Sequence, residues 1–239
     1  MKKIFFILTI LNFITFNLAS AQNISTHEEL KYACENLSIK PTLNFYTSYG
    51  KLEYNQTYTR ANLTQLGKNM GMFESGDLAS GLALVDIASE YELSIAARKM
   101  KNNAVCVMPQ ELTAYIGFQN PVIYLATDLE TDSCLYNLVL RHEQIHQQIN
   151  VNALEYFIPL IYKRIKEITK SMKPIYILSE KQIKATTAEL TNYYAKQINL
   201  LVEEFKREIL VEQHKLDNRQ QYDLESNICR NYNEKHQKK

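Results

Sequence analysis

Hydrophobic and polar residues follow two different spacings along this chain. Between residues 42 and 127 they form short apolar or alternating stretches, which turn-forming pairs such as Gly50-Lys51 and Asn120-Pro121 separate. That pattern is typical of β-strands joined by turns. After residue 128 apolar residues recur every three or four positions, which is typical of amphipathic helices. The pattern therefore predicts a strand-rich part followed by a helical part.

The strand-rich part predicts a mostly antiparallel sheet. Residues 43–49 and 52–58 flank a Gly-Lys turn and are expected to form a hairpin. Residues 61–72 and 76–89 fit short helices as well as strands. Further strands are expected at residues 91–100, 104–108, 112–118 and 122–126.

Two long helices are predicted after residue 128. The first follows N-capping candidates at residues 131–133, and Pro159 is expected to kink it or to start another helix. After a break at residues 173–174, residues 179–216 form the second helix, and the short break favours an antiparallel helical hairpin. The apolar stripes comprise Leu135, Leu138, His142, Ile145, His146, Ile149 and Ala153 in the first helix, and Ile183, Leu190, Tyr194, Leu201 and Phe205 in the second.

The N-terminus has the layout of a signal peptide. Lys2 and Lys3 precede an apolar run from residue 4 to about residue 18, and Ala19-Ser20-Ala21 supplies a small-x-small cleavage pattern. Residues 1–21 are therefore expected to be removed. The run is short for a membrane span, which needs about 20 residues, and no other segment is apolar enough to remain in a bilayer. Abundant Asn, Lys and Ile suggest a bacterial source, so we expect an exported protein, periplasmic or secreted.

Composition narrows the choice of partners and of metal ligands. The 27 basic and 26 acidic residues give no positive excess, which disfavours nucleic-acid binding. An exported chain with four cysteines favours two disulfides. Three pairings are open; we prefer Cys106 with Cys134 and Cys34 with Cys229. A thiolate zinc site is disfavoured because no two cysteines have C-x-x-C spacing.

The strongest chemical signal is the H-E-x-x-H motif formed by His142, Glu143 and His146. Residues four apart lie on one face of a helix, so both imidazoles can reach one metal ion. Glu143 then lies beside them, where its carboxylate can take a proton from water held by the metal. The motif therefore predicts a Zn²⁺ site with His142 and His146 as ligands and Glu143 as the catalytic residue.

A catalytic zinc normally has a third protein ligand, and the motif does not supply one. If the helical hairpin folds about residues 174–177, the motif lies opposite roughly residues 205–210, because both helices rise equally per residue. Glu208 and Glu212 continue the inward stripe at that level and are the first candidates. The other candidates are Glu204, His214 and Asp217, while Asn150 could support a ligand through a hydrogen bond.

These elements predict an α+β fold. A mostly antiparallel sheet at residues 22–128 precedes a helical half at residues 129–239, which holds the metal-site helix and the long antiparallel helical hairpin. About 218 residues remain after the leader, enough for one integrated domain.

Two segments carry a family resemblance. Between residues 106 and 159 the chain contains C-V-M-P, I-G-F-Q-N-P-V-I-Y-L-A-T-D-L, S-C-L-Y-N-L-V-L-R-H-E-Q-I-H and L-E-Y-F-I-P, and residues 214–229 read H-K-L-D-N-R-Q-Q-Y-D-L-E-S-N-I-C. Together these segments resemble an uncharacterised group of exported bacterial H-E-x-x-H proteins, related to predicted secreted zinc-dependent proteases. The resemblance implies a zincin-like fold and the roles given above to the motif. It also makes Asp217 and Tyr222 worth testing.

The leading hypothesis is an exported zinc-dependent metallohydrolase, first of all a peptidase that acts on peptides or proteins. Residues 122–126 are expected to form an edge strand that pairs with an extended substrate, and Tyr124 and Tyr156 are possible oxyanion donors. Amide bonds of peptidoglycan peptides are a related substrate. The alternative is a catalytically inactive metal-binding protein or a helical interaction protein of the bacterial envelope.

Overall fold

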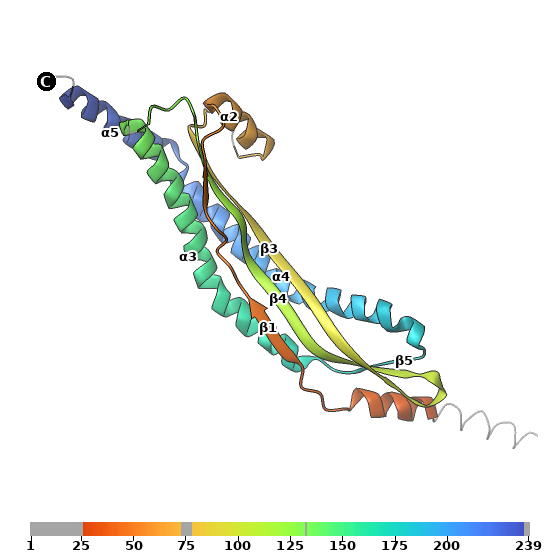
Figure 1. The fold of residues 1–239 in the computed structure, drawn as a ribbon. Helices are drawn as coiled ribbons and strands as arrows, with labels where there is room; N and C mark the ends of the chain where they lie inside the picture. Colours follow the sequence, from red (N-terminus) through yellow and green to blue (C-terminus); the bar gives the residue numbers. More distant parts are fainter. Residues whose placement is uncertain (1–25, 73–77, 132, 237–239) are drawn as a thin grey trace, which may run out of the picture. The chain divides into compact units, whose positions relative to one another are not determined.

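The computed structural model describes residues 26–72, 78–131 and 133–236, and within them the α+β class is confirmed (Figure 1). The expected signal peptide at residues 1–21 lies outside the described residues. In the part of the chain that is described, none of the helices is both long enough and apolar enough to cross a membrane.

The sheet is organised around one long strand. Each of the other four strands pairs with β4 (Val105–Leu125), and these are β1 (Thr42–Tyr46), β2 (Glu53–Asn55), β3 (Gly81–Lys99) and β5 (Ile175–Ile177). β2 runs parallel to β4, with Tyr54 opposite Ile123. β5 runs antiparallel to β4, with Tyr176 opposite Cys106. The sheet is therefore mixed, because it includes the parallel strand β2 beside the antiparallel pairing that the sequence predicted.

Three details of the strand prediction are wrong. β1 and β2 do not form a hairpin, because both pair with β4 rather than with each other. Residues 122–124 are not a free edge, since they pair with β2 on one side while the Ala126 amide donates to Ser80 beside β3 at 2.9 Å. The expected breaks within β4 are also absent. At Asn120 the backbone takes a left-handed conformation, with φ of 50°, and the strand continues through Pro121.

Three long helices follow the main strands. They are α3 (Cys134–Ser171), α4 (Ile183–Leu216) and α5 (Arg219–His236), while α2 (Arg60–Asn69) is a short helix before β3. α3 continues through Pro159, so this proline does not start another helix. The connection from α3 to α4 contains β5 and the short 3-10 helix η2 (Glu180–Gln182).

The described chain divides into two compact units. One contains the described residues of Met1–Asn44, Glu92–Thr113 and Lys166–Ala195; the other contains those of Phe45–Tyr91, Ala114–Ile165 and Lys196–Lys239. Each unit therefore takes segments from both the strand-rich and the helical half of the sequence.

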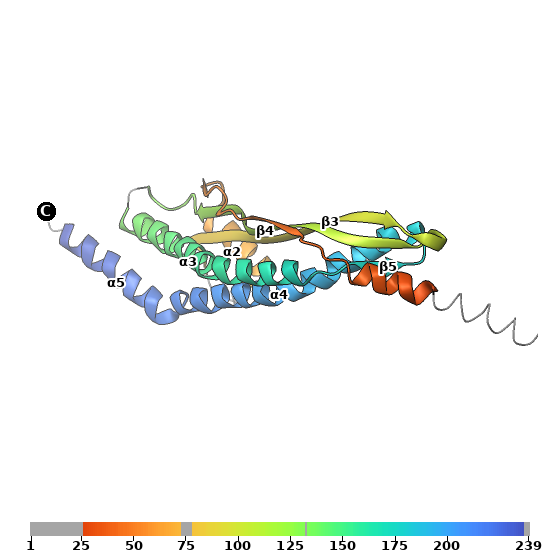
Figure 2. The same cartoon turned by 90° about the horizontal axis from the view of Figure 1, so that it is seen from below.

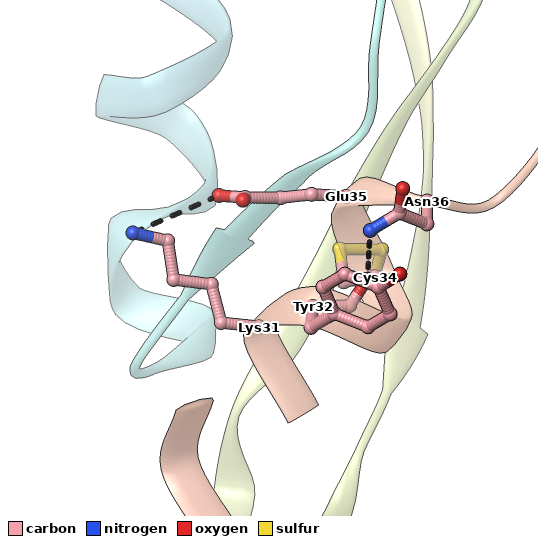
Figure 3. Close-up of a disulfide and its surroundings, with 6 residues drawn as sticks. Lys31, Tyr32, Cys34, Glu35 and Asn36 are labelled. Carbon is pink, nitrogen blue, oxygen red and sulfur yellow. Dashed lines mark hydrogen bonds and ion pairs between the residues drawn. A yellow bond between two sulfur atoms is a disulfide. The ribbon is translucent and has the colours of Figure 1, made fainter. Parts of the chain in front are cut away.

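In the first unit, a disulfide fastens the helical segment at residues 26–35 to the start of β4. It joins Cys34 to Cys106, and both cysteines are fully buried. Around it, Lys31 and Glu35 form an exposed ion pair and the Asn36 side chain donates to the Tyr32 carbonyl at 2.8 Å (Figure 3). A small apolar core lies near β5 and consists of Val105, Val107 and Ile177, with Ile95, Ile175 and Ile183 packed against it.

In the second unit, α3 and α4 lie side by side in antiparallel order (Figure 2). Phe157 of α3 contacts Phe205 of α4, with ring centroids 5.6 Å apart, and Phe205 also contacts Phe118 of the sheet. The second disulfide joins Cys134, the first residue of α3, to Cys229 of α5. A second apolar cluster holds α2 and the strands together and comprises Leu63, Ala79, Ile123, Leu125, Ala126, Leu129 and Val139.

Two disulfides are thus confirmed, but the preferred pairing is wrong. We had paired Cys106 with Cys134 because they flank the segment just before the motif helix, where a bridge would fasten that helix to the preceding strands. β4 is instead one continuous strand of 21 residues, so it does not return Cys106 to the start of α3. Each cysteine finds a partner within its own compact unit.

Candidate metal centre

The motif lies near the start of α3, in the second unit. Ser133 caps this helix, because its side-chain oxygen accepts from the Tyr136 amide at 3.1 Å. His142, Glu143 and His146 follow on the helix and are all buried, at 5%, 6% and 7% exposure. Buried imidazoles and carboxylates require partners, so the contacts of these three side chains define the site.

Three ligand atoms converge between α3 and the end of α4. The Nε2 atoms of His142 and His146 lie 3.0 Å apart, and Asp217 Oδ1 lies 3.2 Å from the first and 3.1 Å from the second. In a tetrahedral zinc site, metal–ligand bonds near 2 Å place neighbouring ligand atoms about 3.3 Å apart. The spacing of His142, His146 and Asp217 therefore fits one metal ion, and this group could hold one.

The opposite ring nitrogens of both histidines have their own acceptors. His142 Nδ1 lies 3.2 Å from Glu225 Oε1, and His146 Nδ1 contacts Gln213 Oε1. The Gln213 amide nitrogen donates to the His146 carbonyl at 3.1 Å and to Asn150 Oδ1 at 2.9 Å, so the amide oxygen is the atom that faces the ring. Each Nδ1 is therefore the donor, which leaves each Nε2 available to a metal.

Tyr222 of α5 holds the carboxylate in place. Its hydroxyl donates to Asp217 Oδ1 at 2.6 Å, and its ring lies over His142 with centroids 5.4 Å apart. Asp217 itself follows the last residue of α4, and its amide donates to the Gln213 carbonyl at 3.0 Å. The site is thus built from α3, the bend between α4 and α5, and α5 itself.

Opposite charges dominate the protonation of the metal-free site. Burial lowers the pKa of His142, but hydrogen bonds with Asp217 and Glu225 outweigh it and raise the pKa to about 9. The pKa of His146 is also raised, because its contacts with Asp217 and Gln213 outweigh burial. For Asp217, burial raises the pKa, whereas hydrogen bonds from both histidines and Tyr222 lower it well below its usual range. These shifts favour protonated imidazole paired with the Asp217 carboxylate.

Glu143 lies against the first residues of β3. A Cβ added at Gly81 would lie 2.6 Å from Glu143 Oε1, which shows how closely the carboxylate approaches this strand. Burial raises the pKa of Glu143 to about 7, although the two histidines and the Ala83 backbone act in the opposite direction. A carboxylate with this pKa can both accept and return a proton near neutral pH.

Replacing Gly81 with alanine is expected to lower the free energy of unfolding by about 1–3 kcal/mol, as overpacking does elsewhere. The new methyl group would lie 2.6 Å from Glu143 Oε1 and 2.7 Å from Val139 Cγ1, so both side chains must move. Urea unfolding measures the change. In a Glu143→Ala background the same substitution should cost less; an equal cost in both backgrounds would contradict the close contact with Glu143.

Asn150 belongs to a network that ties α3 to the sheet. Its amide nitrogen donates to Gln147 Oε1 at 3.2 Å, and Gln147 in turn donates to the Leu84 carbonyl at 3.0 Å. Asn150 also accepts from Gln213, which contacts His146. Asn150 is therefore linked to the His146 imidazole through the side chain of Gln213.

The structure does not bring Glu208 and Glu212 to the histidines. With Glu204 they line a separate groove of about 470 Å³, whose other wall includes Ile149 and Tyr156. Glu212 also forms an ion pair with Lys215.

The difference arises in the connection between the helices. α4 begins at Ile183, four residues later than expected, because β5 and η2 occupy the connection. The residues of α4 that lie opposite the motif are therefore closer to the end of α4 than we had expected. There Gln213 contacts His146.

Two residues of the site were missed. Asp217 was a lesser candidate and Tyr222 was suggested only by the resemblance, but nothing pointed to Gln213 or Glu225. Tyr222, Glu225 and Cys229 are spaced three and four residues apart, which places them on one face of a helix. That spacing was the available signal for Glu225.

Comparison with known proteins adds no relative from which a role could be transferred. No family model, no curated protein and no solved structure matches this chain. The chemical assignment of the site therefore depends on its own side chains.

Proposed function

We propose that this protein is an exported zinc-dependent metallohydrolase and that its substrates are peptides or proteins. The observation that carries the proposal is the convergence of two imidazole Nε2 atoms and one carboxylate oxygen within 3.0–3.2 Å of one another. Two histidines and one carboxylate are the ligand set of several catalytic zinc sites, which keep a fourth position open. Glu143 supplies a buried carboxylate next to the first histidine on the same helix.

The residues of the site have separate roles in this proposal. His142, His146 and Asp217 would hold the ion; bound zinc would polarise a substrate carbonyl and increase the acidity of water at the open position. Glu143, with its pKa raised to about 7 by burial, accepts a proton from water and passes it to the leaving nitrogen. Tyr222 keeps the Asp217 carboxylate oriented through its 2.6 Å hydrogen bond.

The choice of zinc is supported by the type of ligand. Imidazole favours zinc, copper, iron and nickel, whereas calcium and magnesium prefer oxygen ligands alone. A carboxylate one residue after the first histidine is the arrangement that zinc hydrolases use for proton transfer.

Peptide substrates are supported by the strand beside Glu143. Among the strands that the structure describes, β3 pairs with β4 alone, so no second strand covers its other edge. Such an edge can bind an extended peptide through main-chain hydrogen bonds. In this proposal β3 is the substrate-binding edge strand, the role that we had expected for residues 122–126.

Export is supported by the two disulfides and by the leader-like N-terminus. Disulfides form and persist in oxidising compartments outside the cytoplasm, and all four cysteines of this chain are bridged.

The function can be tested with a peptide library. Oxidised protein loaded with zinc is incubated with the library, and the products are identified by mass spectrometry. We expect new cleavage products that disappear when a chelator removes the metal and return when zinc is restored. Zinc-loaded protein that cleaves nothing would favour the alternative, a metal-binding protein without catalysis.

Replacing Glu225 with glutamine is expected to lower zinc affinity by about 10–100-fold, the usual effect of losing the partner of a metal-bound histidine. The variant keeps the shape of the side chain but removes the charge that lies 3.2 Å from His142 Nδ1. Competition with a chromophoric chelator measures the affinity. Asp223→Asn, an exposed carboxylate on the same helix, serves as the control, and an equal effect of both variants would contradict the specific role of Glu225.

Zinc affinity is also expected to fall as the pH falls. The metal-free protein holds a proton on His142 below its pKa of about 9, and zinc must displace that proton from Nε2. Between about pH 9 and pH 6, the affinity should fall about tenfold per pH unit for each proton displaced. Chelator competition across this range measures the slope, and an affinity that does not change with pH would contradict the protonated state of His142.

A further inference from the structure

We propose that the disulfide between Cys134 and Cys229 is a thiol-exchange site that controls the metal centre. When it is reduced, α5 loses its attachment to α3 and metal affinity falls. The inference rests on the metal binding proposed above, and it adds a means of regulating that binding.

The disulfide joins α3, which carries both motif histidines, to α5, which carries Tyr222 and Glu225. On α3, Cys134 lies two turns before His142; on α5, Cys229 lies one turn after Glu225. Residues four apart on a helix share one face, so the bridge fixes the face of α5 that presents Glu225 to His142, 3.2 Å from its Nδ1.

Little apolar packing is available to hold α5 without the bridge. Of the α5 side chains whose burial the structure describes, Cys229 alone is buried, with 8% exposure, while Leu224 and Ile228 are 57% and 52% exposed. The contacts of α5 with the metal site that the structure describes come from Tyr222, whose hydroxyl donates to Asp217 and whose ring contacts His142, and from Glu225. Water competes with the polar contacts among them, so each contributes little by itself.

The two disulfides differ in their access to solvent. Cys34 and Cys106 are both fully buried, whereas Cys134 is partly exposed. Thiol exchange requires a thiolate to reach one sulfur of the bridge. We therefore expect a reductant in solution to react faster with the bridge beside the metal site than with the fully buried bridge of the other compact unit.

The reaction is a two-electron exchange with a dithiol reductant. A reductant thiolate attacks a sulfur of the bridge and forms a mixed disulfide, and one cysteine leaves as its thiolate. The second thiolate of the reductant then attacks the mixed disulfide and releases the other cysteine. The products are two protonated cysteines and the oxidised reductant, so atoms and electrons balance.

Reduction and metal binding must affect each other equally. If reduction lowers the affinity for metal by some factor, bound metal makes reduction less favourable by the same factor. The metal-loaded protein should therefore resist reduction at Cys134 and Cys229 better than the metal-free protein does.

The first test compares zinc affinities of two double variants by chelator competition. Cys134→Ser/Cys229→Ser should lose about 10–100-fold in affinity, because the partner of His142 and the orientation of Asp217 are no longer fixed. Cys34→Ser/Cys106→Ser is the matched control and should stay within about twofold of wild type, as expected for an independent site. Equal losses of affinity in both variants, or no loss in the first, would overturn the proposal that the disulfide between Cys134 and Cys229 controls metal binding. Wild-type protein that binds no zinc would instead overturn the proposed function.

The second test needs no variant, so it remains decisive if a double variant fails to fold. Oxidised wild-type protein is treated with a phosphine reductant, with and without zinc, and free thiols are trapped by alkylation and identified by mass spectrometry. Cys134 and Cys229 should be labelled first, and zinc should slow their labelling. Simultaneous labelling of all four cysteines, or labelling that zinc does not change, would overturn the proposal.

Discussion

Glu143→Gln is expected to reduce peptide hydrolysis by about 100- to 10,000-fold, the range for removal of a general acid–base group. Glutamine keeps the size of the buried side chain but cannot accept the proton. The three ligand atoms come from other residues, so zinc content should not change. Cleavage rates and metal content are measured on the same preparation.

The control for this substitution is Glu155→Gln, an exposed glutamate on the same helix, which should keep full activity. A Glu143→Gln variant that still cleaves peptides would contradict the role of Glu143. Loss of zinc together with activity would show that Glu143 supports the metal rather than the proton transfer.

Asp217→Ala is expected to lower zinc affinity by more than about 100-fold, beyond the usual effect of losing an outer hydrogen-bond partner. The substitution removes one of the three proposed ligand atoms and leaves only the two imidazoles. It also removes the acceptor of the Tyr222 hydroxyl. Chelator competition measures the affinity, and the absorption spectrum of the cobalt-substituted protein reports the number of ligands.

Glu208→Gln and Glu212→Gln are the matched controls for Asp217, because the sequence had put both forward as the third ligand. In the structure they line a different groove, so neither change should alter zinc affinity. The assignment of Asp217 would be contradicted if either glutamate variant lost zinc while Asp217→Ala retained it.

The sequence predicted those parts of the site that depend on local geometry. His142 and His146 are one helical turn apart, and the stripe of apolar residues placed them on the buried face, where both are found. Ser133 was among three capping candidates and is the residue that caps α3. These predictions depend only on the periodicity of side chains along one helix.

Predictions that depend on distant parts of the chain were less accurate. The third ligand was sought around Glu208 because the hairpin was folded at its midpoint, and no local pattern revealed that β5 would lengthen the connection. The disulfide pairing had the same weakness, because the course of β4 decides which cysteines meet. Asn120-Pro121 was taken as a turn, but a left-handed residue let the strand continue.

The central claim is that this chain binds a metal through its two motif histidines. Elemental mass spectrometry of the purified, oxidised protein, beside a His142→Ala/His146→Ala variant, tests it most directly. We predict about one zinc per wild-type chain, the stoichiometry of a mononuclear site, and none in the variant. Wild-type protein that contains no metal, even after zinc has been supplied, would contradict the account.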